Sequence, residues 1–146
     1  MKNIDKKLQR FIDAQDEMTY KRALEELLSG KKKTHWMWFI FPQITGLGQS
    51  ELAKYFGIES LQEAEEYWNH PLLGARLREC ISIVNNLNVP AEKIFGEVDA
   101  QKFCSCITLF LQIDSDIDKS QLGEALHQFY GGQLDQKTLT LLRNGS

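Results

Sequence analysis

Apolar residues recur every three or four positions along most of the chain, which is the spacing of one face of an α-helix. Such stripes cover residues 8–12, 20–28, 73–87, 103–111 and 122–130. No Gly/Ser-rich linker divides them, and no internal repeat of fixed period is present. The pattern predicts an all-α fold: one compact domain over residues 1–146 with about seven or eight helices, several of them short, and no repeat solenoid.

Capping residues mark where several of these helices begin and end. Ser50 is a good N-cap for a short helix, and Ser60 with Glu63 forms a capping box for the next one. Gly30 and Gly131 follow apolar stripes, where a left-handed C-terminal cap belongs. These residues predict helix boundaries from local chemistry alone.

Three aspartates are expected to start helices in the second half of the chain. Gly96 ends a short helical turn, and Asp99 is then predicted to be the N-cap of the following helix. Residues 114–118 form a polar loop, and Asp118 at its end is a further N-cap candidate. Asp135 is expected to cap the last helix.

The stretch that departs most from this pattern is residues 34–43, which read THWMWFIFPQ. Its aromatic residues favour a β-strand, but no convincing second strand is present to pair with it. We therefore predict a short helix that is capped by Thr34 and ended by Pro42. In that helix one face holds Trp36, Phe39 and Ile40, and the others hold Trp38 and Phe41.

Charge and cysteine content narrow the kinds of partner and compartment. The formal net charge of −3 and the pI of about 5.6 argue against a protein that coats nucleic acid or an anionic membrane. The longest apolar run, residues 36–41, is too short to span a bilayer, and no secretory signal opens the sequence. Cys80, Cys104 and Cys106 are odd in number, which favours free thiols in a cytoplasmic protein. No histidine or cysteine spacing indicates a metal site, and no cofactor is expected.

The aromatic run also carries a resemblance to a known family. Together with Gly46-Leu47-Gly48 and Ser50 it is similar to the signature of the domain-of-unknown-function family 1810, whose members are often labelled "calpastatin" in bacterial genomes. Further similar segments are residues 70–74, 76–77, 94–96 and 105–110, with Asp99, Lys102, Gly132, Asp135 and Thr138, so that the resemblance covers nearly the whole chain.

The resemblance implies a mostly helical single domain and carries no activity with it. Two departures are visible: Ser-Cys-Ile-Thr-Leu-Phe at residues 105–110, where the family usually has Ser-Ser-Met-Thr-Leu-Phe, and Tyr-Phe-Gly-Ile at residues 55–58, where it usually has Tyr-Ala-Ile. Neither departure removes a charged group. The "calpastatin" label has little physical support, because a calpain inhibitor of that type is disordered and this chain has the pattern of a packed core.

The first candidate site is the aromatic run with its polar companions. Trp36 and Trp38 could hold a planar ligand, His35 and Gln43 could contact its polar edge, and the lysines at 31–33 would attract phosphate. The same stripe is also typical of a buried core helix, which is the more common reason for such a pattern. Gly46-Leu47-Gly48 before Ser50 resembles an anion-binding loop only weakly, and a plain turn explains it.

The second candidate is a set of charged and polar residues later in the chain. Asp99, Lys102 and Ser105 are spaced by three, so that they share one helix face, and Arg76 could add a second cation. A structural salt bridge explains Asp99 and Lys102 equally well. If the two candidates converge, the ligand-binding residues are His35, Trp36, Trp38, Gln43, Arg76, Lys102 and Ser105.

Three functions stay open at this point. The sequence favours a small-ligand-binding or interaction module whose aromatic and cationic site suits a phosphate-bearing planar ligand of nucleotide type. The first alternative is a small hydrolase acting on a nucleotide or ADP-ribose conjugate, with Asp99 or His35 as its acid/base candidates. The second alternative is a protein-interaction domain that uses an exposed aromatic patch, with an unknown partner.

Overall fold

The computed structural model describes residues 2–114 and 117–145, and within these the chain forms nine helices and no β-strand beyond a single bridge. The all-α fold expected from the sequence is confirmed. The helices are α1 (Lys2–Ala14), α2 (Glu17–Leu28), α3 (Met37–Ile40), α4 (Glu51–Phe56), α5 (Leu61–Asn69), α6 (Leu73–Asn85), α7 (Ala91–Leu111), α8 (Ser120–Tyr130) and α9 (Gln136–Gly145).

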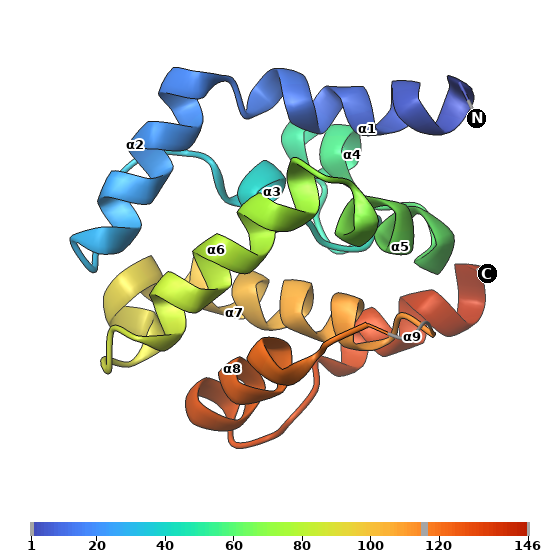
Figure 1. Ribbon diagram of the computed structural model, residues 1–146. Coiled ribbons are helices and arrows are strands. Elements are labelled where there is room, and N and C mark those ends of the chain that lie inside the picture. The colour runs from blue at the N-terminus through green and yellow to red at the C-terminus, as the bar shows by residue number, and fades with distance from the viewer. Residues whose placement is uncertain (1, 115–116, 146) are drawn as a thin grey trace.

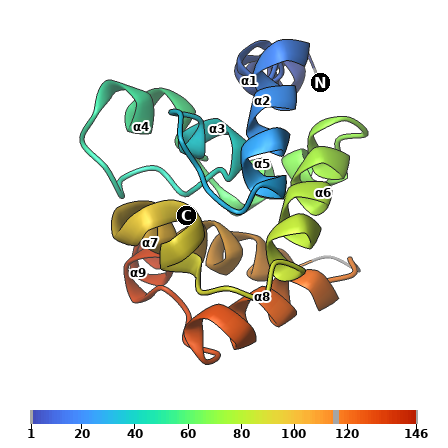
Figure 2. The same ribbon diagram turned by 90° about the vertical axis from the view of Figure 1, so that its left-hand side faces the viewer.

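Helices α6 and α7 lie at the centre of the arrangement. α6 packs against α2, α5 and α8, and α7 packs against α5, α8 and α9. Figure 1 shows α6 running diagonally in front of α7, with α1 along the upper edge and α2 on the left. After a 90° turn, α4 lies on the opposite side of the view from α6, with α3 between them, and both α3 and α4 lie above the start of α7 (Figure 2). The aromatic run therefore faces the first half of α7.

An aromatic cluster fills the space between these helices. The Phe41 ring meets Phe95 and Phe103 edge-on, with centroids 5.8 and 5.0 Å apart. Deeper in the core, the rings of Tyr67 and Phe110 lie 5.8 Å apart. Such ring pairs add about 0.5–1.5 kcal/mol to the free energy gained from burial. Phe41 thus joins the aromatic run to α7 through the core.

Most of the predicted caps are confirmed, but the capping box is only half formed, because the Glu63 carboxylate accepts the N–H of Glu59 at 2.8 Å and not that of Ser60. Ser50 and Ser60 each accept a hydrogen bond from the backbone N–H three residues later, both at 3.1 Å. Asp135 does the same at 3.3 Å. Gly30 and Gly131 have φ angles of +80° and +61°, in the left-handed region expected of a C-terminal cap.

The prediction that Asp99 is an N-cap is wrong. Gly96 does break the helical geometry, with φ +82° and ψ 166°, but the helix resumes directly after it, so that α7 continues through this kink. Asp99 therefore lies inside the first turn of the second half of α7, and its carboxylate pairs with Lys32 and Lys102.

The prediction that Asp118 is an N-cap is also wrong by one residue. The residue at the N-cap position of α8 is Lys119, whose side chain makes no capping hydrogen bond. The Asp118 carboxylate accepts the N–H of Ser120, the first residue of α8, at 3.0 Å. Residues 115 and 116 of the predicted polar loop lie outside the described residues.

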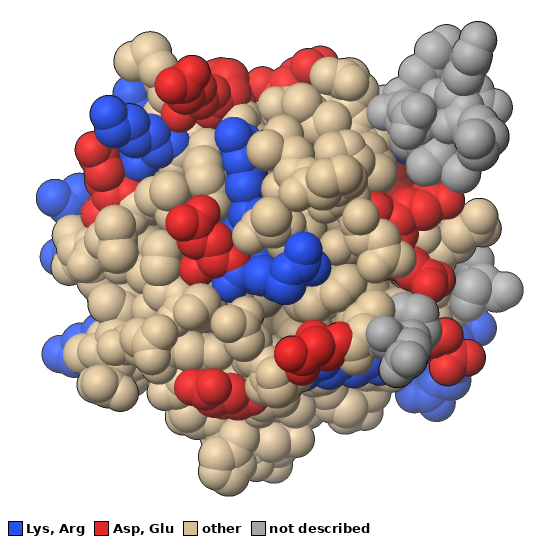
Figure 3. Space-filling model, viewed as in Figure 1, with Lys and Arg blue, Asp and Glu red and all other residues tan. Residues whose placement is uncertain are grey.

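The length of the helices and the distribution of surface charge bear on the kinds of partner that this protein could have. Over residues 2–114 and 117–145, no helix combines the length and the apolar character that a membrane span requires. The face drawn in Figure 3 carries basic and acidic side chains next to one another, with wide uncharged areas between them.

Candidate functional site

A buried carboxylate on α2 fixes the segment that leads into α3. Glu26 is 8% exposed, and its Oε1 accepts hydrogen bonds from the backbone N–H groups of Lys33 (2.6 Å) and Thr34 (3.0 Å) and from the indole N–H of Trp36 (2.9 Å). The Thr34 hydroxyl donates to Oε2 at 2.6 Å. Burial alone would raise the pKa of Glu26, but these hydrogen bonds lower it to about 2. The ionised carboxylate therefore holds residues 33–36 against α2.

This anchor explains why the aromatic run departs from its predicted form. The Thr34 hydroxyl is engaged by Glu26 and does not cap a helix, so that prediction is wrong. Only residues 37–40 are helical, and α3 starts after Trp36 without a side-chain cap. Glu26 draws the Trp36 indole into the core beside Phe41, whereas Phe39 and Trp38 are half-buried. Phe39, which was predicted to share one helix face with Trp36 and Ile40, is therefore less buried than either of them.

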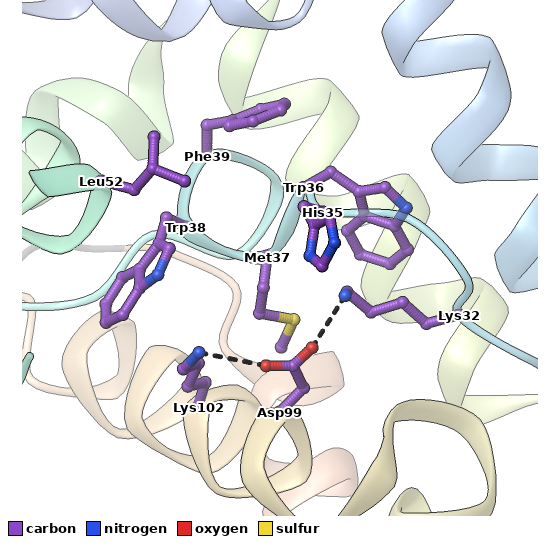
Figure 4. Close-up of a pocket in the computed structure, with 9 residues that line it drawn as sticks. All are labelled: Lys32, His35, Trp36, Met37, Trp38, Phe39, Leu52, Asp99 and Lys102. Atoms are coloured by element: carbon purple, nitrogen blue, oxygen red, sulfur yellow. Dashed lines mark ion pairs between the residues drawn. The ribbon is translucent and has the colours of Figure 1, made fainter. Parts of the chain in front are cut away.

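Two lysines converge on Asp99 beside α3 (Figure 4). The Nζ of Lys32 lies 2.8 Å from Oδ2, and the Nζ of Lys102 lies 3.2 Å from Oδ1. The side chains of Lys32, Asp99 and Lys102 are 8%, 18% and 26% exposed, respectively. Burial would raise the pKa of Asp99, but the ion pairs with the two lysines outweigh that effect and lower it. The ionised carboxylate thus faces two ammonium groups, which leaves a surplus of positive charge.

Each of these lysines also lies over a tryptophan ring. The Nζ of Lys32 is 5.2 Å from the centroid of Trp36, and the Nζ of Lys102 is 4.7 Å from that of Trp38, which are cation–π distances. The Trp38 indole also packs against Gly48, where an added Cβ would lie only 3.0 Å from Cη2 of the ring. A glycine at this position lets the loop after α3 hold the indole closely.

Two hollows meet at Trp38 and Lys102, which line both. The smaller, of about 130 Å³, lies between α3, α4 and α7 and is also lined by His35, Met37, Leu52 and Asp99 (Figure 4). The larger, of about 430 Å³, extends towards the start of α9 and is also lined by Gln43, Gly48, Gln101, Ser105 and Asp135. A ligand with two chemically different parts could therefore contact both hollows across the Trp38 ring.

Six of the seven ligand-binding candidates lie around these hollows. His35, Trp36, Trp38 and Lys102 line the smaller one together with Asp99, the acid/base candidate. Gln43 and Ser105 line the larger one. Gln43 is only 1% exposed, and its amide donates to the Phe41 carbonyl at 3.2 Å, so much of its side chain serves the fold.

Arg76 does not complete this site. Its guanidinium donates to the Gln15 carbonyl at 2.6 Å and lies 4.2 Å from the centroid of the Tyr20 ring. These contacts tie α6 to the junction of α1 and α2, away from both hollows. The helical spacing could not reveal this, because the partners come from the first twenty residues of the chain.

Sequence reasoning missed three polar residues of the larger hollow: Gln101, Asp135 and Lys137. Gln101 lies one residue before Lys102 on α7, and Asp135 was assigned only the role of a helix cap. No local signal marks any of the three, because the hollow forms only where α7 meets the start of α9 and the loop before it. Within residues 2–114 and 117–145, no three histidine, cysteine, aspartate or glutamate side chains are grouped so that they could hold a metal ion.

Comparison with known proteins places the chain in a family. Residues 5–142 match the family described as "Protein of unknown function (DUF1810)". The fold is also similar to the crystal structure of the conserved hypothetical protein Rv1873 from Mycobacterium tuberculosis, with 45% sequence identity, a TM-score of 0.88, and coverage of 93% of this chain and 96% of that chain. No curated protein matches the chain. Because the family match spans nearly the whole sequence, the chain belongs to the DUF1810 family of proteins of unknown function.

Proposed function

We propose that this protein binds a small ligand that joins a phosphate group to a planar ring, as a nucleotide does, at the two hollows that meet at Trp38. The observation that carries the proposal is the position of Lys102. Its ammonium group lies 4.7 Å from the Trp38 ring centroid, lines both hollows, and shares Asp99 with a second lysine, Lys32.

The charge of the cluster favours an anionic group. Lys32 is the more enclosed lysine, with the shorter contact to Asp99, whereas Lys102 is more exposed and has the longer contact. A phosphate would supply the second anionic partner that the two ammonium groups lack. Because these side chains are largely shielded from water, the charge-assisted bonds would be stronger than on an open surface.

The aromatic wall favours a planar ring. Stacking of a base on an aromatic side chain contributes about 1–3 kcal/mol to binding. The larger hollow, at about 430 Å³, falls within the range of roughly 300–1,000 Å³ that is usual for small-ligand sites, whereas the smaller one, at about 130 Å³, suits a single compact group. Leu52 and Val98, 48% and 71% exposed, add apolar surface at the rims. We therefore place the ring in the larger hollow and the phosphate near Lys102.

A hydrolase acting on a nucleotide or ADP-ribose conjugate is the second candidate, because Asp99 and His35 line the same hollow as Lys102. The lowered pKa of Asp99 leaves this carboxylate ionised, so that it has no proton to give to a leaving group and suits a base or a charge partner. Binding without turnover needs no such proton and is the simpler proposal. A protein-interaction patch has less support, because Trp36 is 2% exposed and Trp38 is half-buried.

We place this function in the cytoplasm. The three cysteines are all free and buried, which is the usual state of thiols in a reducing compartment. Burial raises the pKa of the Cys80 thiol to about 12 and that of Cys104 to about 11, so these groups are unreactive at neutral pH.

The Lys102→Met variant tests the proposal. We expect wild-type protein to bind AMP or ADP-ribose, and the variant to bind the same ligand at least about tenfold more weakly, because one charge-assisted bond to phosphate is lost. Isothermal titration calorimetry measures both affinities. Lys93→Met is the matched control, because Lys93 is exposed on the same helix and lines neither hollow.

Two results would contradict the proposal. Wild-type protein that gives neither a heat of binding nor a thermal shift with nucleotides and ADP-ribose derivatives has no such site. Equal affinities for Lys102→Met and Lys93→Met would show that any binding occurs elsewhere.

A further inference from the structure

Asp135 lies at the polar end of the larger hollow, and buried partners hold it in place. Its backbone N–H donates to the Thr108 hydroxyl at 2.9 Å, and its Oδ2 accepts the Ser105 hydroxyl at 2.8 Å and the Thr138 N–H at 3.3 Å. Ser105 and Thr138 are 4% and 0% exposed. The carboxylate therefore has a fixed orientation, which a residue that recognises a ligand requires.

The two oxygens of this carboxylate differ in the bonds they already accept. Oδ2 is occupied by the Ser105 hydroxyl and by both the N–H and the hydroxyl of Thr138. Oδ1 accepts one bond, from the side-chain amide of Gln101 at 3.2 Å. A carboxylate oxygen has about two lone-pair sites, so Oδ1 can take a second donor. Gln101, Ser105 and Asp135 all line the larger hollow, and Oδ1 is the oxygen of this carboxylate that accepts fewer bonds, so Oδ1 is the atom that would take a donor from a ligand there.

We infer that Asp135 determines which planar group the larger hollow accepts, by selecting a base that presents an exocyclic amino group over one that presents a carbonyl in the same place. The inference rests on the proposed function, because it assumes that the ring lies against Trp38. An ionised carboxylate is an acceptor only, so that an amino group gains a hydrogen bond while a carbonyl meets unfavourable charge. The ligand class is then a phosphate ester of an adenine-type or cytosine-type nucleoside.

The Asp135→Asn variant gives a prediction that a purely structural role does not. The N–H of Thr138 can only donate, so the amide oxygen must take the place of Oδ2 and the amide nitrogen that of Oδ1. The exposed Gln101 side chain can rotate to accept from that nitrogen. Asparagine is also as good an N-cap as aspartate, so α9 keeps its cap. The variant thus presents a donor to the hollow and should prefer a carbonyl.

The experiment compares AMP with IMP, which carries a carbonyl where AMP carries its amino group, by calorimetry on wild-type protein and on Asp135→Asn. We expect wild-type protein to bind AMP at least about tenfold more tightly than IMP. In Asp135→Asn this preference should disappear or reverse, with a melting temperature close to that of the wild type. CMP and UMP form a second pair with the same difference and should follow the same order.

Each outcome decides a different point. Equal binding of AMP and IMP by wild-type protein, with both weakened by Lys102→Met, would overturn the role of Asp135 and leave the proposed function intact. An unchanged preference in a folded Asp135→Asn variant would also overturn it. If neither nucleotide of either pair binds wild-type protein, the proposed function and this inference both fail. If the variant does not fold, the two wild-type pairs still decide the selectivity.

Discussion

The Gly74→Ala variant is expected to lose on the order of 3 kcal/mol of unfolding free energy, although alanine is the better helix former. Gly74 is the second residue of α6, at the sharp junction with α5. A Cβ added there would lie 2.0 Å from the carbonyl oxygen of Trp68 and 2.8 Å from its carbonyl carbon. Because these are backbone atoms at the end of a packed helix, they cannot move aside as a flexible side chain would. Chemical denaturation with urea measures the change.

Gly123→Ala is the matched control for this prediction. Gly123 also lies inside a helix, α8, but an added Cβ there would meet nothing within 4 Å, and its φ is not positive. This substitution is expected to stabilise the protein by about 0.5–1 kcal/mol through helix propensity and a less flexible unfolded chain. Similar unfolding midpoints for the two variants would contradict the close approach of α6 to the end of α5.

The Glu26→Ala variant is expected to lose about 3–4 kcal/mol of unfolding free energy, because the N–H groups of Lys33, Thr34 and Trp36 are left without their shared acceptor. The stability of Glu26→Gln should lie between that of Glu26→Ala and that of the wild type. Its amide oxygen can keep the three N–H bonds, while the Thr34 hydroxyl turns to accept from the new nitrogen. Glu25→Gln, exposed on the same helix, is expected to change little. Guanidinium unfolding at neutral pH compares the set.

The contribution of Glu26 to the free energy of unfolding should also depend on pH. The pKa of Glu26 falls from 4.5 in its ordinary state to about 2 in the folded protein, so folding favours the ionised form. The lowered pKa corresponds to a contribution of about 3 kcal/mol to the free energy of unfolding. This contribution is fully present above pH 4.5 and is lost as the pH falls towards 2. The stability difference between wild type and Glu26→Gln should therefore shrink across that interval. A difference that stays constant down to pH 2 would contradict the anchoring role of the charge.

Much of the fold could be predicted from the sequence because helix boundaries depend on nearby residues. Ser50 and Ser60 bond to N–H groups three positions later, and Gly30 and Gly131 adopt left-handed geometry at the next turn. These interactions are local, so their spacing is visible in the sequence itself. Where the local reading was wrong, as at Asp99, an equally plausible partner lay far away in the chain: Lys32 on the segment before α3.

The candidate site could be predicted only in part, for the same reason. Trp38 and Lys102 were recognisable as an aromatic and a cation, but only the tertiary fold places α3 beside α7, with the Lys102 ammonium 4.7 Å from the centroid of the Trp38 ring. Arg76 has the same charge as Lys102, yet its contact with the Gln15 carbonyl takes it out of the site. Which cation faces a ligand therefore depends on the contacts between distant segments.

The sequence by itself determined the all-α class, most helix ends and the family, since each follows from local spacing or from a specific run of residues such as 34–43. The tertiary structure alone decided what that run does. Glu26 pulls Trp36 into the core and leaves Trp38 at the boundary of two hollows. The physical reason is that a buried carboxylate must be satisfied by the donors that the fold brings to it, and here those donors are the N–H groups of Lys33, Thr34 and Trp36 at the start of the run.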